Sequence, residues 1–154
     1  MYRFNLEPEG VKMNKKGVTL VELVVVMVII AVGATLAAPS IGKWLPRYRL
    51  RSATRDIVST MRTAQMRAVS YNRSYQVAFT PALGTYVLQR NPGAVNDGAV
   101  QTVPTGISFA TNFPGNIVAF NPNSTATGGS VTVSNPQSQR TITVAPSSGR
   151  ISAP

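Results

Sequence analysis

One stretch of the chain decides its fold: Lys15–Pro39, with the sequence KKGVTLVELVVVMVIIAVGATLAAP. The apolar part of this stretch, Val18–Ala38, contains a single charged residue, Glu22. As an α-helix rising ~1.5 Å per residue, this part would be ~31 Å long, about the thickness of the hydrocarbon core of a bilayer. The stretch therefore predicts a transmembrane helix that carries the rest of the chain.

Basic residues before the apolar run predict how the helix is oriented. Lys12, Lys15 and Lys16 should stay on the cytoplasmic side, which places the C-terminal part across the membrane. A cleaved secretory signal is the alternative, because small residues end the run. Glu22 argues against that alternative, since a carboxylate costs ~2.5–3.5 kcal/mol at the bilayer centre and such residues are by default functional. We therefore expect the helix to be retained.

The composition excludes several kinds of chemistry. The 154 residues include no cysteine and no histidine, which removes thiolate metal sites and the commonest general base. Only Asp56 and Asp97 supply carboxylates after the apolar run. We therefore expect no enzyme activity, no cofactor and no metal. The formal net charge of +10 predicts attraction to polyanions or anionic lipid.

A second, amphipathic part of the helix is predicted after the apolar run. Pro39 and Pro46 should bend the helix, because proline lacks an amide donor. The helix should then continue to about Tyr71, before Asn72 breaks it. Apolar residues recur at spacings of three and four and define one face that should pack on a sheet: Leu50, Ala53, Ile57, Met61, Ala64 and Ala68.

Arginines cover another face of the same predicted helix. Five of them fall within a sector of ~80° at ~100° per residue: Arg47, Arg51, Arg55, Arg62 and Arg73. A solvated charged face is one interpretation. The other is a phosphate-binding stripe, because only Asp56 could balance these charges locally.

Beyond Asn72 the composition changes to Val, Thr, Ser, Asn, Pro and Gly, which is typical of strands and turns. We predict strands at 74–80, 85–90, 100–103, 106–110, 117–120, 131–134, 140–145 and 149–151, with a loop over 121–130. The predicted fold class is α+β, with a long N-terminal helix packed on a small antiparallel β-sandwich-like head. The predicted divisions are a leader (1–17), a transmembrane helix (18–38), an amphipathic helix (39–72) and the β-rich head (73–154).

The N-terminal residues resemble a known signature. Lys15-Lys16-Gly17 followed by Val18-Thr19-Leu20-Val21-Glu22 is similar to the prepilin signature of type IV pilins and type II secretion pseudopilins. The resemblance implies cleavage by a prepilin peptidase between Gly17 and Val18 and N-methylation of the new N-terminus. The family usually has phenylalanine where this chain has Val18. The resemblance also implies that Glu22 pairs with the N-terminal amine of a neighbouring subunit, which offsets the cost of burying either charge alone.

The C-terminal part narrows the resemblance. Phe120-Asn-Pro, a Gly-rich loop, two strands and Gly149-Arg150-Ile151 are similar to the GspH/FimT group of minor pilins and pseudopilins. The resemblance implies a structural subunit of a type IV pilus or a type II secretion pseudopilus. Such a subunit sits in the bacterial inner membrane with its head in the periplasm, and its partners are other pilins or pseudopilins.

The alternative function is DNA binding during natural transformation. Some FimT proteins use a C-terminal Gly-Arg-x-Arg motif, and here the corresponding run, Gly149-Arg150-Ile151-Ser152, lacks the second arginine. Arg150 and the five helix arginines would then contact DNA. The other interpretation of Arg150 is that it ends an edge strand and discourages pairing between sheets.

Overall fold

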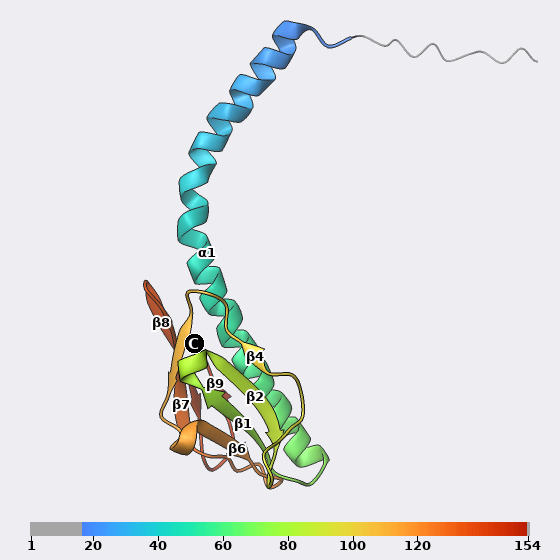
Figure 1. Ribbon diagram of the computed structural model, residues 1–154, viewed down its shortest axis with the longest axis vertical. Helices are drawn as coiled ribbons and strands as arrows, with labels where there is room; N and C mark the ends of the chain where they lie inside the picture. The colour runs from blue at the N-terminus through green and yellow to red at the C-terminus, as the bar shows by residue number, and fades with distance from the viewer. Residues whose placement is uncertain (1–16, 154) are drawn as a thin grey trace, which may run out of the picture. The chain divides into compact units, whose positions relative to one another are not determined.

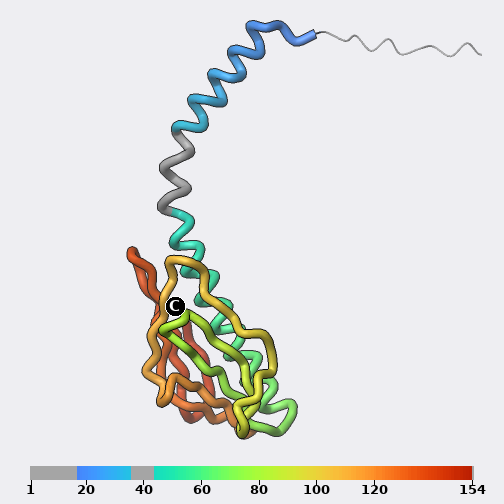
Figure 2. The backbone as a smooth tube through the Cα atoms, in the orientation of Figure 1, coloured from blue at the N-terminus to red at the C-terminus, as the bar shows by residue number. Residues whose placement is uncertain are grey.

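The computed structural model describes residues 17–153, apart from the side chains of residues 36–43 (Figure 2). The predicted leader, except Gly17, and the expected bend at Pro39 lie outside what is described. The chain divides into two compact units, residues 1–40 and 41–154. Helix α1, Leu20–Ser70, contributes to both units (Figure 1).

The amphipathic part of α1 packs as its periodicity predicts. All six residues of the predicted apolar face are at most 2% exposed. The helix ends as expected near Asn72, which has a positive φ of 47°. The Arg73 N–H donates to the Ala68 carbonyl (3.1 Å) and the Asn72 N–H to the Val69 carbonyl (3.3 Å). These two bonds form a Schellman cap, so the last carbonyls of the helix are satisfied before the chain turns into the head.

The first sheet of the head is antiparallel and has strand β1, Tyr75–Thr80, near its centre. On one side β1 pairs with β2 (Thr85–Arg90), and on its other side β1 pairs with β6 (Ile117–Phe120). The short strands β3 (Val95–Asn96) and β4 (Gln101–Thr102) pair with the outer side of β2. The 3-10 turn η1 (Pro81–Leu83) joins β1 to β2, and η2 (Pro114–Asn116) precedes β6.

The second sheet is also antiparallel and has the order β5-β7-β8-β9. Its strands are β5 (Ser108–Thr111), β7 (Gly129–Asn135), β8 (Ser138–Val144) and β9 (Ile151–Ser152). Both sheets and the buried face of α1 share one core, to which Val77, Phe120 and Val131 contribute fully buried side chains. The observed fold class is therefore the predicted α+β arrangement.

The structure departs from the sequence prediction at several strand boundaries: β7 begins at Gly129, inside the predicted loop 121–130, and β9 begins at Ile151 rather than at position 149. No strand was predicted between 90 and 100, but the chain forms β3 there, a two-residue strand too short to leave an alternating pattern. Helix α1 continues through Pro46, and the expected bend at this residue stays a prediction. The Pro46 carbonyl accepts a hydrogen bond from Asn135 Nδ2 (3.0 Å), so the β7–β8 turn supports the helix beside this proline.

Candidate functional site

The predicted cleavage position lies just before α1. Gly17 and Val18 are exposed and precede the first helical residue, Leu20. A Cβ atom at position 17 would meet no atom within 4 Å. Packing among the described residues therefore does not require a glycine here.

Glu22 has a local role that the sequence prediction missed. The Glu22 N–H donates to Thr19 Oγ1 (3.2 Å), so Thr19 caps α1 and Glu22 occupies the third helical position. Thr19-x-x-Glu22 is the sequence pattern of a capping box, and a carboxylate in the first turn also suits the helix dipole. Among the described residues the Glu22 carboxylate makes no ion pair. Glu22 is exposed.

The first part of α1 has apolar side chains on every face. From Val18 to Val32 the large apolar residues are between 48% and 80% exposed. A helix that is apolar all round is normally covered by lipid or by other protein. No helix in the part of the chain that the structure describes combines the length and the hydropathy needed to cross a membrane.

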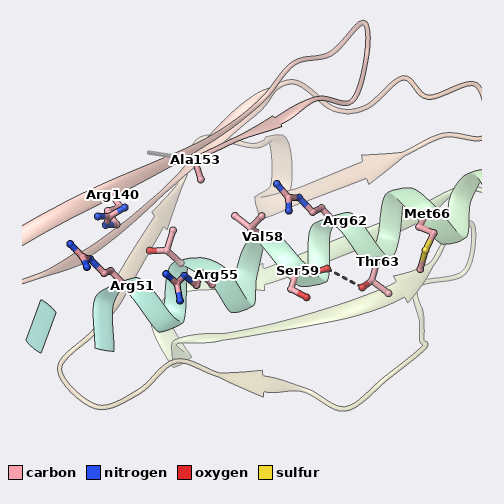
Figure 3. Close-up of a pocket in the computed structure, with 10 residues that line it drawn as sticks. Arg51, Arg55, Val58, Ser59, Arg62, Thr63, Met66, Arg140 and Ala153 are labelled. Carbon is pink, nitrogen blue, oxygen red and sulfur yellow. Dashed lines mark hydrogen bonds between the residues drawn. The ribbon is translucent and has the colours of Figure 1, made fainter. Parts of the chain in front are cut away.

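Three of the predicted arginines line one groove with an arginine from the second sheet. Arg51, Arg55 and Arg62 project from α1, and Arg140 projects from β8 (Figure 3). The groove has a volume of about 580 Å³. An adjoining groove of about 260 Å³ shares Arg51 and Arg140 and adds Arg47. The structure thus gathers positive charge where the helix faces the start of β8.

The other two predicted arginines lie elsewhere. Arg73 is in the turn after α1, and Arg150 precedes β9; neither lines these grooves. Gly149, beside Arg150, has a φ of 60°, and an added Cβ would lie 2.8 Å from the Ser124 carbonyl oxygen. The conformation and the close approach both require glycine there. Gly149 of the Gly-Arg-Ile run therefore has a structural explanation in this chain.

Sequence reasoning did not identify Arg140 as part of the groove. Its neighbours in the groove are in α1, far away in the sequence, so no local pattern links them. The alternation of β8 was the only available signal, because Ile142 and Val144 are buried and side chains two residues apart share a face. That alternation places Arg140 on the face that packs toward α1.

The head also contains one perturbed titratable group near α1. Burial raises the pKa of Tyr86 above its ordinary value of 10.0, and the nearby Asp56 carboxylate raises the pKa further. A side-chain hydrogen bond with Thr60 opposes these effects. Tyr86 is 4% exposed, so it serves the core and does not offer a reactive phenol to solvent.

Comparisons with known proteins agree with this architecture. The profile of the family described as type II transport protein GspH matches residues 53–148. The prokaryotic N-terminal methylation motif matches residues 12–38. No curated protein matches the chain at a significant level.

Two similar solved structures show the same fold. One is the type IV minor pilin FimU of Pseudomonas aeruginosa, with a TM-score of 0.59 and 15% identity, covering 70% of this chain and 90% of FimU. The other is EpsH, a minor pseudopilin from the type 2 secretion system of Vibrio cholerae, with a TM-score of 0.53 and 13% identity, covering 66% of this chain and 92% of EpsH. The GspH profile spans most of the chain, and the methylation motif covers the stretch that precedes it. The chain therefore belongs to the GspH family of the type IV pilin and pseudopilin superfamily.

Proposed function

We propose that this chain is a structural subunit that is processed by prepilin peptidase after Gly17 and then joins or primes a type IV pilus or a type II secretion pseudopilus. The observation that carries the proposal is the exposed surface at the start of α1, which is apolar except for Glu22 and begins three residues after an exposed Gly17. Such a surface needs lipid before assembly and neighbouring helices afterwards. The methylation motif over residues 12–38 supports cleavage at this position, and Val18 would be the N-methylated residue.

The same surface suggests where the subunit resides. Before assembly, α1 anchors the chain in the bacterial inner membrane as a single pass, with Lys15 and Lys16 in the cytoplasm and the head in the periplasm. Assembly then exchanges lipid contacts for contacts with the helices of other pilins or pseudopilins. The chain acts as a building block, and the chemistry performed on it belongs to the peptidase.

Glu22 stabilises the contact between neighbouring helices in the assembled fibre. Its carboxylate is near the start of α1 and makes no ion pair among the described residues. After cleavage, the new amine at Val18 carries a positive charge in each subunit. Stacking one helix past the next brings the amine of one subunit to the carboxylate of another, and pairing removes the cost of burying each charge alone.

Replacing Gly17 with leucine tests the processing step. We expect unprocessed protein to accumulate, because a side chain at this position obstructs the peptidase while leaving the fold of the chain unchanged. Gly33→Leu is the matched control, since an added Cβ at position 33 also meets nothing within 4 Å. Immunoblots of cell membranes separate the two forms by size. Mature protein of Gly17→Leu with its N-terminus at Val18 would refute the processing step.

Replacing Glu22 with alanine tests assembly separately. Membrane insertion and cleavage should persist, because removing a charge favours residence in lipid. Recovery in sheared fibres should fall at least about tenfold, since the neighbouring amine would be buried without a partner. Thr19→Ala is the control: it removes the capping oxygen but leaves the carboxylate, and it should retain most of the recovery. Equal recovery of Glu22→Ala and the unaltered protein contradicts the pairing.

DNA binding, the alternative function, has less support. Four of its six expected arginines line the two adjoining grooves, and Arg73 and Arg150 lie outside them. A gel shift at two salt concentrations tests this alternative, because phosphate-dominated affinity is strongest at low salt. Binding that is absent at low salt would exclude DNA as the ligand of the head.

A further inference from the structure

We infer that the two adjoining grooves form a docking site for an extended acidic segment of another protein, which pairs with the open edge of β8. We call this surface the arginine groove, and its cationic residues are Arg47, Arg51, Arg55, Arg62 and Arg140. The inference goes beyond the proposed function and does not depend on cleavage at Gly17.

Charge is the first observation. Within residues 17–153, only Glu22, Asp56 and Asp97 carry carboxylate side chains. Asp97 is paired with Arg67, and Asp56 lies near Tyr86. No acidic side chain among them pairs with Arg51, Arg55 or Arg62. Guanidinium groups that converge in one groove repel each other, so the groove should favour a ligand that supplies several negative charges.

The sheet edge beside the groove is the second observation. Strand β9 pairs only with Thr143 and Val144 of β8. Nearer the start of β8, no described strand pairs on the side away from β7. Ser138, Gln139 and Arg140 at this open edge also line the groove. An edge of this kind is a template for strand addition.

The hydrogen-bond register between β8 and β9 identifies which backbone groups of β8 are free to pair with an added strand. The Ala145 N–H donates to the Arg150 carbonyl (3.0 Å), so odd-numbered residues of β8 direct their N–H and C=O groups toward the β9 side. Gln139 therefore presents both groups at the open edge. A strand added there continues the line of β9. Its alternate side chains point toward α1, as Ile142 and Val144 do.

The dimensions of the groove match a short strand. Arg47 and Arg55 are eight positions apart on α1, which is ~12 Å along the helix axis, or about four residues of extended chain. Arg47 and Arg51 line the groove together with the open edge of β8. The side chains of Arg51 and Arg55 are one turn apart on the same face (Figure 3). Acidic residues at alternate positions of the added strand would meet this row of arginines.

Apolar lining selects a peptide over nucleic acid. Val58, Met66 and Ala153 line the groove among the arginines, and Met66 is 62% exposed. The methylene groups of glutamate side chains that face α1 can cover this surface, and the peptide backbone can use the edge of β8. A phosphate backbone would use the arginines alone. The favoured ligand is therefore a strand-forming segment with Glu or Asp alternating with aliphatic residues.

The experiment measures binding of a fluorescent synthetic peptide of about ten residues, in which glutamate and valine alternate, to the full chain in neutral detergent. Fluorescence anisotropy reports the affinity. We expect binding that weakens roughly tenfold in the double variant Arg51→Gln/Arg55→Gln, because two exposed ion pairs are lost. The control Arg73→Gln/Arg150→Gln removes the same charge outside the groove and should change the affinity less than about twofold. Thermal unfolding of both variants checks that the fold is retained.

Two further ligands make the test specific. A peptide of the same sequence with N-methyl groups on alternate amides retains its charge but cannot pair with β8, and we expect it to bind at least about tenfold more weakly. A single-stranded oligonucleotide of similar charge should also bind more weakly than the unmodified peptide. Equal losses in the two double variants, undiminished binding of the methylated peptide, or tighter binding of the oligonucleotide would overturn the inference.

Discussion

At the scale of single residues, three nearby positions at the start of the described chain, Gly17, Thr19 and Glu22, differ in their surroundings and hydrogen bonds. Gly17 has open space around it, so packing among the described residues does not require a glycine there. Thr19 caps α1, and its hydroxyl satisfies the Glu22 N–H. Because the backbone of Glu22 is satisfied locally, its carboxylate can serve an intermolecular contact. Glu22 thus contributes to helix initiation, and its carboxylate is the group that we propose to act in assembly.

Tyr86 predicts how the stability of the head depends on pH. Burial raises its pKa in the folded chain above 10.0, the value that we expect in the unfolded chain. The folded state then holds the phenolic proton more tightly. The contribution of the protonated Tyr86 to the free energy of unfolding is therefore complete below about pH 10, and it is lost as the pH rises through the pKa of Tyr86 in the folded chain.

The variant Tyr86→Phe should remove this contribution. Denaturant unfolding at several pH values should show that the unaltered protein loses more stability above about pH 10 than the variant does, while the difference between them stays constant from pH 7 to 9. The same decline in both proteins above pH 10 would show that Tyr86 does not keep its proton through burial.

At the scale of elements, α1 joins two surfaces with different requirements. Its first part exposes apolar side chains on all faces, and its second part buries one face in the head. The buried face uses small residues, Ala53, Ala64 and Ala68, between the larger Ile57 and Met61. Small side chains allow the helix to approach the sheets closely, and the larger ones fill the space between the strands.

Shortening Ile57 should destabilise the head. Ile57→Ala removes a side chain that is 0% exposed and leaves a cavity, so the free energy of unfolding should fall by ~2–5 kcal/mol. Met66→Ala on the exposed side of the same helix should change it by less than ~0.5 kcal/mol. Denaturant unfolding followed by circular dichroism measures both. A small effect of Ile57→Ala would mean that α1 does not anchor the core.

At the scale of the whole molecule, local patterns predicted most of the elements but not their assembly. The three-and-four spacing from Leu50 to Ala68 predicted the buried face, because helical periodicity is a property of neighbouring residues. The division of the strands into two sheets depends on pairings between distant segments, such as β1 with β6, which no local pattern records. The groove could be predicted only in part, for the same reason. The spacing of the arginines in α1 predicted that they share one face, but the fold alone brings Arg140 of β8 beside them.

The most direct test of the proposed function is the N-terminus of the protein in assembled fibres. Fibres sheared from cells that produce the unaltered chain would be digested and examined by mass spectrometry for the first peptide. We predict that the chain is present and that its first residue is Val18, with or without an added methyl group. Recovery of the chain in fibres with residues 1–17 still attached, or its absence from fibres of cells that process it normally, would contradict the proposed function.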